Sequence, residues 1–129
     1  MADNMTIVLP GVPPSLNATA GRKNVWAYRE AKAEWTRWVW GACMTHKDRP
    51  KEPWERSLVV ITYYFPDRRR RDADNYSGKY LLDGLKKAGV IVDDDLNHIS
   101  PFIQGGYDKN NPRTEIAVIR CGTEGRRGR

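Results

Sequence analysis

The residues best suited to chemistry lie in one polar segment, residues 67–75, which combines four arginines with three aspartates. Asp72 and Asp74 are two positions apart, so in an extended turn their carboxylates point roughly the same way and can share one cation. A second acidic group, Asp93–Asp95, follows later in the chain. Mg²⁺ prefers oxygen ligands and is often held by a few carboxylates together with water and substrate phosphate. This pattern predicts a Mg²⁺ site, which Mn²⁺ could also occupy.

Basic residues accompany these acids. Lys79 lies four residues after Asn75 and would share its face of a helix, about one turn from the acids, where it could donate to a scissile phosphate or stabilise a leaving group. The cations expected to hold the neighbouring DNA backbone are Arg68, Arg69, Arg70, Arg71, Lys86 and Lys87. A carboxylate-held Mg²⁺ can polarise a phosphoryl oxygen and orient water. The combination predicts hydrolysis of a nucleic-acid phosphodiester.

Each of these motifs also has a simpler interpretation. The acids at 72–74 could only cap a helix, and Lys79, Asp83 and Lys87 could form an i,i+4 ion-pair ladder. The arginine run could be a solvated patch or a targeting signal, and residues 93–95 could be an ordinary acidic turn. The co-occurrence of all four motifs within one short stretch favours a functional site.

The hydrophobic pattern predicts the elements that must position these residues. Strands are expected at residues 5–9, 57–65, 98–104 and 113–120, with a short strand or extended link at 90–92, and helices at 27–46 and 75–88. Loops are expected at 10–24 and around the Gly105-Gly106…Asn111-Pro112 turn. This order predicts an α+β or α/β domain. Of the two we expect the α+β class, as a single two-layer domain with a mixed sheet and two helices.

The two helices carry more detailed expectations. The first should bury one apolar stripe, made of Ala27, Ala31, Trp35, Trp38 and Ala42, and place Trp40 on the other side. The second should be capped by Asp74 or Asn75 and should end at Gly89. Its apolar stripe comprises Tyr76, Tyr80, Leu81, Gly84, Leu85 and Ala88.

Composition limits the class of protein. The chain has 129 residues, of which 40% are hydrophobic and 29% charged, which is typical of one globular domain. A formal net charge of +6 favours polyanionic partners, most often nucleic acid. No apolar run approaches the roughly 20 residues of a membrane-spanning helix, so we expect no membrane partner. Cys43 and Cys121 are too few and too far apart for a disulfide scaffold or a zinc finger, which suits a reducing cytosol.

The stretch from Asp67 to Asp95, DRRRRDADNYSGKYLLDGLKKAGVIVDDD, resembles the core of the RusA family of Holliday-junction resolvases. A weaker similarity lies upstream, in the proline-rich segment 9–17. The resemblance covers roughly residues 5–120 and implies a Mg²⁺-dependent homodimer that cuts four-way DNA junctions in recombination and repair. It assigns Asp72, Asp74 and Asp94 as catalytic metal ligands and Lys79 as the catalytic lysine.

We expect a RusA-like domain at residues 1–121 and a cytoplasmic location in a bacterial or phage-infected cell. Residues 122–129 lie outside the resemblance, and their Gly- and Arg-rich composition predicts a mobile basic tail. Lys79 departs from the commonest family spacing, because it is the fifth residue after Asp74 and Gly78 is the fourth. Asp93 or Asp95 could take the place of Asp94.

Three other functions remain open. A non-catalytic nucleic-acid-binding protein would use the arginines and the basic tail, with acids that only cap and solubilise. A nuclease for RNA, flaps or replication forks would use the same acids. A small phage structural protein is the third alternative.

Overall fold

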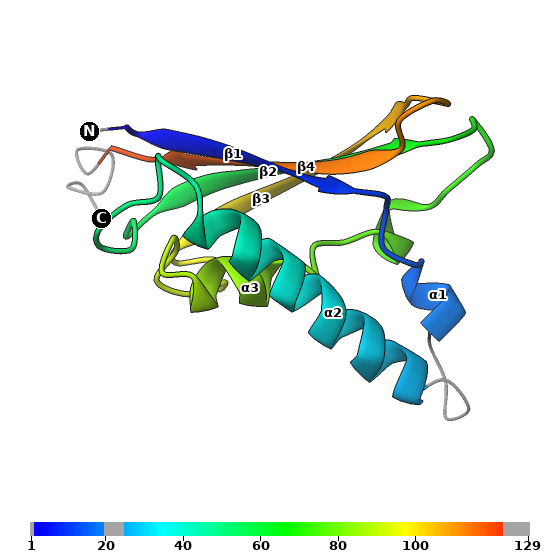
Figure 1. Ribbon diagram of the computed structural model, residues 1–129, viewed down its shortest axis with the longest axis horizontal. Coiled ribbons are helices and arrows are strands. Elements are labelled where there is room, and N and C mark those ends of the chain that lie inside the picture. The colour runs from blue at the N-terminus through cyan, green and yellow to red at the C-terminus, as the bar shows by residue number, and fades with distance from the viewer. Residues whose placement is uncertain (1, 20–24, 123–129) are drawn as a thin grey trace.

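The computed structural model describes residues 2–19 and 25–122, so the predicted tail lies outside it except for Gly122. The strands form one four-stranded sheet, and Figure 1 shows the helices on one face of it. The strands are β1 (Asn4–Pro10), β2 (Ser57–Phe65), β3 (Ile99–Tyr107) and β4 (Arg113–Arg120). The helical elements are α1 (Leu16–Thr19), α2 (Val25–Met44), the 3₁₀ turn η2 (Ala73–Asn75) and α3 (Leu82–Lys87). The predicted α+β class and mixed sheet are confirmed.

The strand order is β1-β4-β2-β3. β4 is antiparallel to both of its neighbours, whereas β2 and β3 are parallel. Parallel strands need a crossover connection, and this crossover carries the arginine run, η2 and α3. Because the two strands run in the same direction, the segment that leaves β2 and the segment that enters β3 lie at opposite edges of the sheet.

The core lies between the sheet and the helices. Every second residue of β1, β2 and β4 faces it, as the alternating pattern of a half-covered sheet requires. The buried strand residues include Met5, Ile7, Leu9, Val59, Ile61, Tyr63, Ile116 and Val118. Trp35, Val39 and Cys43 of α2 and Leu85 of α3 pack against them. This packing fixes α2 and α3 against the sheet.

The buried stripe of α2 differs from the predicted one. Trp35 is buried as expected, and Trp40 is exposed as expected, but Trp38 remains 42% exposed. Trp38 lies edge-on to Trp35, with ring centroids 4.9 Å apart. Val39 and Cys43 occupy the centre of the stripe in its place. The predicted stripe is therefore correct at Trp35, Ala31 and Ala42, which pack in or against the core, and wrong at Ala27 and Trp38, which are exposed.

The predicted helix at 75–88 is also only partly correct. The chain forms η2, then turns, and becomes α-helical only at Leu82. The buried hydroxyl of Tyr63 donates a hydrogen bond of 2.6 Å to the carbonyl of Ser77, which takes that carbonyl out of a helical ladder. The side chains of Asp74 and Asn75 therefore do not cap a helix. Gly89 follows α3 with a positive φ of 75°, as predicted.

Two loop predictions need correction. Gly105 and Gly106 lie within β3, and the turn to β4 follows at residues 108–112. Oδ1 of Asp108 accepts backbone N–H bonds from Asn110 and Asn111 and so shapes that turn. In the predicted loop after β1, residues 16–19 form the short helix α1. The predicted link at 90–92 makes one parallel bridge, between Ile91 and Trp54.

Candidate active site

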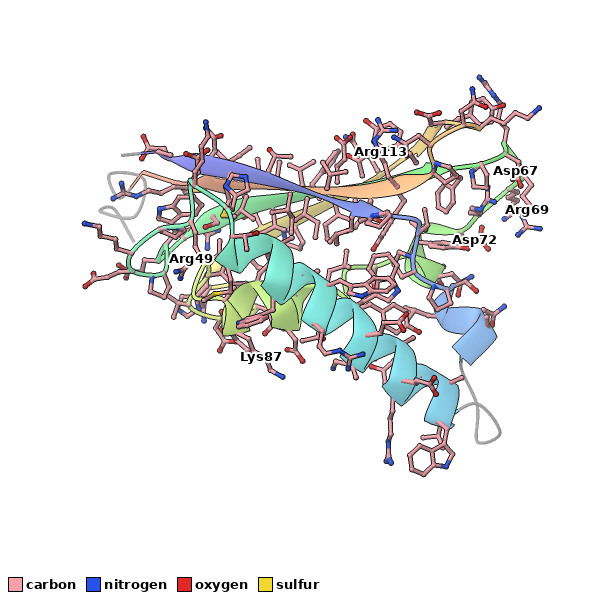
Figure 2. All side chains as sticks on the ribbon, in the orientation of Figure 1. Arg49, Asp67, Arg69, Asp72, Lys87 and Arg113 are labelled. Atoms are coloured by element: carbon pink, nitrogen blue, oxygen red, sulfur yellow. The ribbon has the colours of Figure 1, made fainter. Side chains whose placement is uncertain are left out.

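The loop between β2 and η2 carries the arginine run, and Arg71 closes it. Nη2 of Arg71 lies 2.9 Å from Oδ1 of Asp67. Its Nη1 donates to the carbonyls of Asp67 and Arg69 at 3.1 and 3.2 Å. The side chain of Arg71 is only 11% exposed, whereas those of Arg69 and Arg70 are 77% and 89% exposed. Arg71 thus shapes the loop, whereas Arg69 and Arg70 present their charges to solvent. Figure 2 shows Arg69 extending outward beside Asp67.

Aromatic rings support two of the arginines. The guanidinium of Arg71 lies 4.1 Å from the ring centroid of Phe65, and that of Arg68 lies 4.4 Å from the ring centroid of Tyr107. A Cβ atom at Gly106 would lie 2.7 Å from Cδ1 of Tyr64, so this strand position has no room for a side chain. Phe65 and Tyr107 were not predicted to belong to the site, although the glycine pair before Tyr107 could have indicated a close approach of another group to this strand.

Asp72 and Asp74 follow the loop directly. Asp72 occupies the N-cap position of η2, but its side chain makes no capping hydrogen bond. Its Oδ1 is 3.2 Å from Nη2 of Arg70. Asp74 lies within η2, and both aspartates are exposed. The capping interpretation of these acids is therefore wrong, and their oxygens are open to a cation from solvent.

Lys79 lies in the turns between η2 and α3. Its ammonium is 5.6 Å from the ring centroid of Tyr28 in α2. Because α3 begins only at Leu82, Lys79 does not share a helical face with Asn75. The alternative ladder of Lys79, Asp83 and Lys87 is absent from the described chain, where Asp83 pairs instead with Lys32 and Lys86.

The second acidic group surrounds Lys86, the penultimate residue of α3. Nζ of Lys86 is 3.4 Å from Oδ1 of Asp93 and 4.0 Å from Oδ1 of Asp94. The hydrogen bond that Lys86 donates to Asp93 and the negative charge of Asp94 raise the pKa of Lys86. Asp95 is hydrogen-bonded to Nδ1 of His98. Lys86 is thus engaged by acids, which weakens its candidacy as a DNA contact.

The structure does not bring the two acidic groups together within one chain. Asp72 follows the end of β2, and Asp94 precedes the start of β3, at the opposite edge of the sheet. β2 has nine residues, so at a rise of about 3.3 Å each its ends are roughly 26 Å apart. Among the described residues, no three His, Cys, Asp or Glu side chains are grouped so that they could hold a metal ion.

Comparison with known proteins decides the family. The model of the endodeoxyribonuclease RusA family matches residues 10–119, which is most of the chain. This chain belongs to the RusA family. A search of curated proteins found no match.

Membership of the RusA family confirms several predictions at the level of the family. RusA proteins are endodeoxyribonucleases that resolve Holliday junctions, so the predicted function is the family's function. These nucleases generally depend on a divalent metal ion. No helix in the described part of the chain is long and apolar enough to cross a membrane.

The donor set of this RusA-family chain suits such an ion. Exposed carboxylates are the ligands that hard cations take, and Mg²⁺ usually completes its coordination with water and substrate phosphate. Asp72 and Asp74 supply such oxygens beside the arginine loop, and Asp94 supplies one beside Lys86. The described chain therefore has ligands of the correct type in two separate groups.

Proposed function

We propose that this chain is a homodimeric, Mg²⁺-dependent endonuclease that cuts DNA strands at four-way junctions. The observation that carries the proposal is that exposed arginines lie beside two exposed carboxylates, Asp72 and Asp74, which do not cap a helix. Arg70 pairs with Asp72 at 3.2 Å, so a phosphate held by the loop would lie close to those oxygens. A site for phosphodiester hydrolysis needs this proximity of cations for the backbone and carboxylates for a metal ion.

The residues take the following roles in the proposal. Arg68, Arg69 and Arg70 bind phosphates of the DNA strand, and Arg71 keeps the loop in shape for them. Lys79 donates a hydrogen bond to the leaving-group oxygen, because a positioned cation stabilises the negative charge that develops there. Mg²⁺, when bound by Asp72, Asp74 and Asp94, supplies Lewis-acid activation of the phosphate and of a water nucleophile.

Assembly must bring the metal ligands together. Within one chain Asp94 lies at the far edge of the sheet from Asp72, so one ion can contact all three carboxylates only in a larger complex. A symmetric dimer presents two equivalent sites, which suits a junction with pairs of equivalent strands. In the proposed homodimer, Asp94 of the partner subunit would complete the pair formed by Asp72 and Asp74.

The test is cleavage of a synthetic mobile four-way junction with and without Mg²⁺, beside a linear duplex and a replication fork. Paired nicks in the junction that require Mg²⁺ are expected, with much slower cleavage of the duplex. Equal cleavage of the fork and the junction would replace junction resolution with a broader nuclease function. Binding without cleavage, together with no uptake of Mn²⁺, would leave a non-catalytic DNA-binding protein.

A further inference from the structure

A second basic surface lies away from the arginine loop, in an open groove between α2 and α3. The groove has a volume of about 370 Å³. Four cationic side chains line it, namely Arg29, Lys32, Arg37 and Lys87. Figure 2 shows Lys87 pointing away from the sheet on the helical side of the molecule. None of the α2 cations belongs to the site described above.

Close packing of the two helices makes the groove rigid. Gly84 of α3 faces α2, and a Cβ atom there would lie 2.5 Å from Cβ of Val39 and 2.9 Å from the carbonyl oxygen of Thr36. Only glycine permits this approach. The spacing of the two helices that flank the groove is thus set by a buried backbone contact, and the cationic side chains extend from that fixed base.

The charges of the groove are only partly compensated. Asp83 is the one carboxylate in its lining, and it lies 3.6 Å from Lys32 and 4.0 Å from Lys86. Among the residues that the structure describes, neither Arg37 nor Lys87 forms an ion pair. The groove therefore presents an excess of positive charge to solvent.

The geometry suits a repeating polyanion better than a single anion. Arg29 and Arg37 are eight residues apart on α2, which corresponds to roughly 12 Å along the helix axis. That length exceeds one phosphate group and is long enough to span more than one phosphate of a DNA strand, whose charges repeat about every 3.4 Å along the helix axis. The open shape of the groove likewise offers no enclosure for a small ligand.

The groove also begins beside the candidate catalytic lysine. Tyr28 lines it, and the same ring lies under the ammonium of Lys79 at 5.6 Å. Tyr28 also packs against Tyr80, with ring centroids 5.7 Å apart. The segment that carries Lys79 is therefore in contact with one end of the basic groove.

We propose that the α2–α3 groove binds the phosphate backbone of a duplex arm that leaves the cleavage site. This inference rests on the proposed function and adds a second contact region to it. Arg29 and Arg37 contact phosphates, and Lys32 and Lys87 add to the local potential. Two separated backbone contacts, at the loop and in the groove, would let the protein sense the angle between DNA arms, which is a property of junction geometry rather than of base sequence.

The experiment measures junction binding by the full-length double variant Arg29→Gln/Arg37→Gln over a range of salt concentrations. If both arginines contact phosphates, the slope of log K against log salt should fall by about two. Hydroxyl-radical footprinting of the junction should show loss of protection on one arm, with protection at the cut site retained. The matched control is Lys47→Gln/Lys51→Gln, which removes two exposed charges outside the groove.

Each outcome has a definite meaning. An unchanged slope and footprint in the groove variant, or an equal loss in both variants, overturns the groove proposal. If the wild-type protein binds junctions but cuts nothing in Mg²⁺, the proposed nuclease function fails while the groove variant still tests the binding surface. A second variant, Arg37→Gln/Lys87→Gln, guards against a folding defect in the first and should give the same arm-specific loss.

Discussion

Arg71 and Asp67 form an ion pair at 2.9 Å across the base of the arginine loop. The backbone N–H of Arg69 and the guanidinium of Arg71 together hold the pKa of Asp67 below its usual range. The loop that presents cations to DNA is therefore closed by one of its own arginines. Arg69 and Arg70 remain exposed to solvent although they pair with Asp67 and Asp72, and Arg68 is supported on the ring of Tyr107.

Replacement of Arg71 should reveal this positioning role. Arg71→Lys keeps the positive charge but loses the planar guanidinium. That group pairs with the carboxylate of Asp67, donates to the backbone carbonyls of Asp67 and Arg69, and lies over the ring of Phe65. We expect the lysine variant to bind junctions nearly as poorly as Arg71→Ala, with a lowered urea midpoint in both. Full recovery of binding by lysine would instead identify Arg71 as a simple phosphate contact.

The Asp67 pair also predicts a pH dependence. A carboxyl group with a lowered folded-state pKa stabilises the protein above its ordinary pKa, 3.8 for Asp67, and loses that contribution as the pH falls through the folded-state value. Asp67→Asn should therefore be less stable than the wild type at pH 7, and the gap should shrink below about pH 4. Urea unfolding at several pH values measures this. If the difference in stability between Asp67→Asn and the wild type stayed constant with pH, the charge of the Asp67 carboxylate would not contribute to stability.

Asp74→Asn tests the proposed metal ligands. Cleavage should be abolished, while junction binding should be intact or tighter, because a negative charge near phosphate is removed. Gel shift and cleavage assays on the same junction give the two readouts. Asp48→Asn is the matched control, since Asp48 lies beyond α2, away from the arginine loop, and should keep both activities. Normal nicking by Asp74→Asn would end the metal-site assignment.

Arg69 and Arg70 should provide the salt-dependent part of loop binding. Their double replacement by alanine should lower the slope of log K against log salt by about one to two if both reach phosphates. Arg120→Ala is the control, because Arg120 pairs with Asp3 outside the arginine loop. A slope equal to that of the wild type would mean that the two exposed arginines are bystanders.

The sequence was sufficient for the strands but not for the crossover. The alternation in β1, β2 and β4 depends only on local burial, so the strand predictions were nearly correct. The helix predicted at 75–88 is present only in its second half, as α3, because a tertiary hydrogen bond from Tyr63 to Ser77 replaces part of the helical ladder before it. Periodicity cannot reveal a partner that distant in the chain. The apolar stripe nevertheless remained buried at Leu81 and Leu85, since turns can present the same face.

The candidate site could also be predicted only in part from the sequence. The arginine run, Asp72 and Asp74 lie in one segment after β2, as the motif indicated, but the partners of these side chains depend on the fold. The sequence could not show that Arg71 is nearly buried or that Lys86 pairs with Asp93. Nor could it show that Asp72 and Asp94 lie at opposite edges of the sheet, because that separation follows from the parallel pairing of β2 with β3. The groove of α2 cations was missed because these residues resembled an ordinary solvated helix face.

Two helical glycines give opposite predictions for stability. A Cβ atom at Gly41 meets nothing within 4 Å, so Gly41→Ala should stabilise the protein by about 0.5–1 kcal/mol through reduced backbone entropy in the unfolded chain. At Gly84 the same methyl group would clash with Val39 and with the backbone of Thr36, so Gly84→Ala should destabilise by about 1–3 kcal/mol. Urea unfolding, monitored by tryptophan fluorescence, measures the change in stability of both variants. Equal effects of the two substitutions would contradict the close contact of α2 with α3, and with it the rigid groove on which arm binding depends.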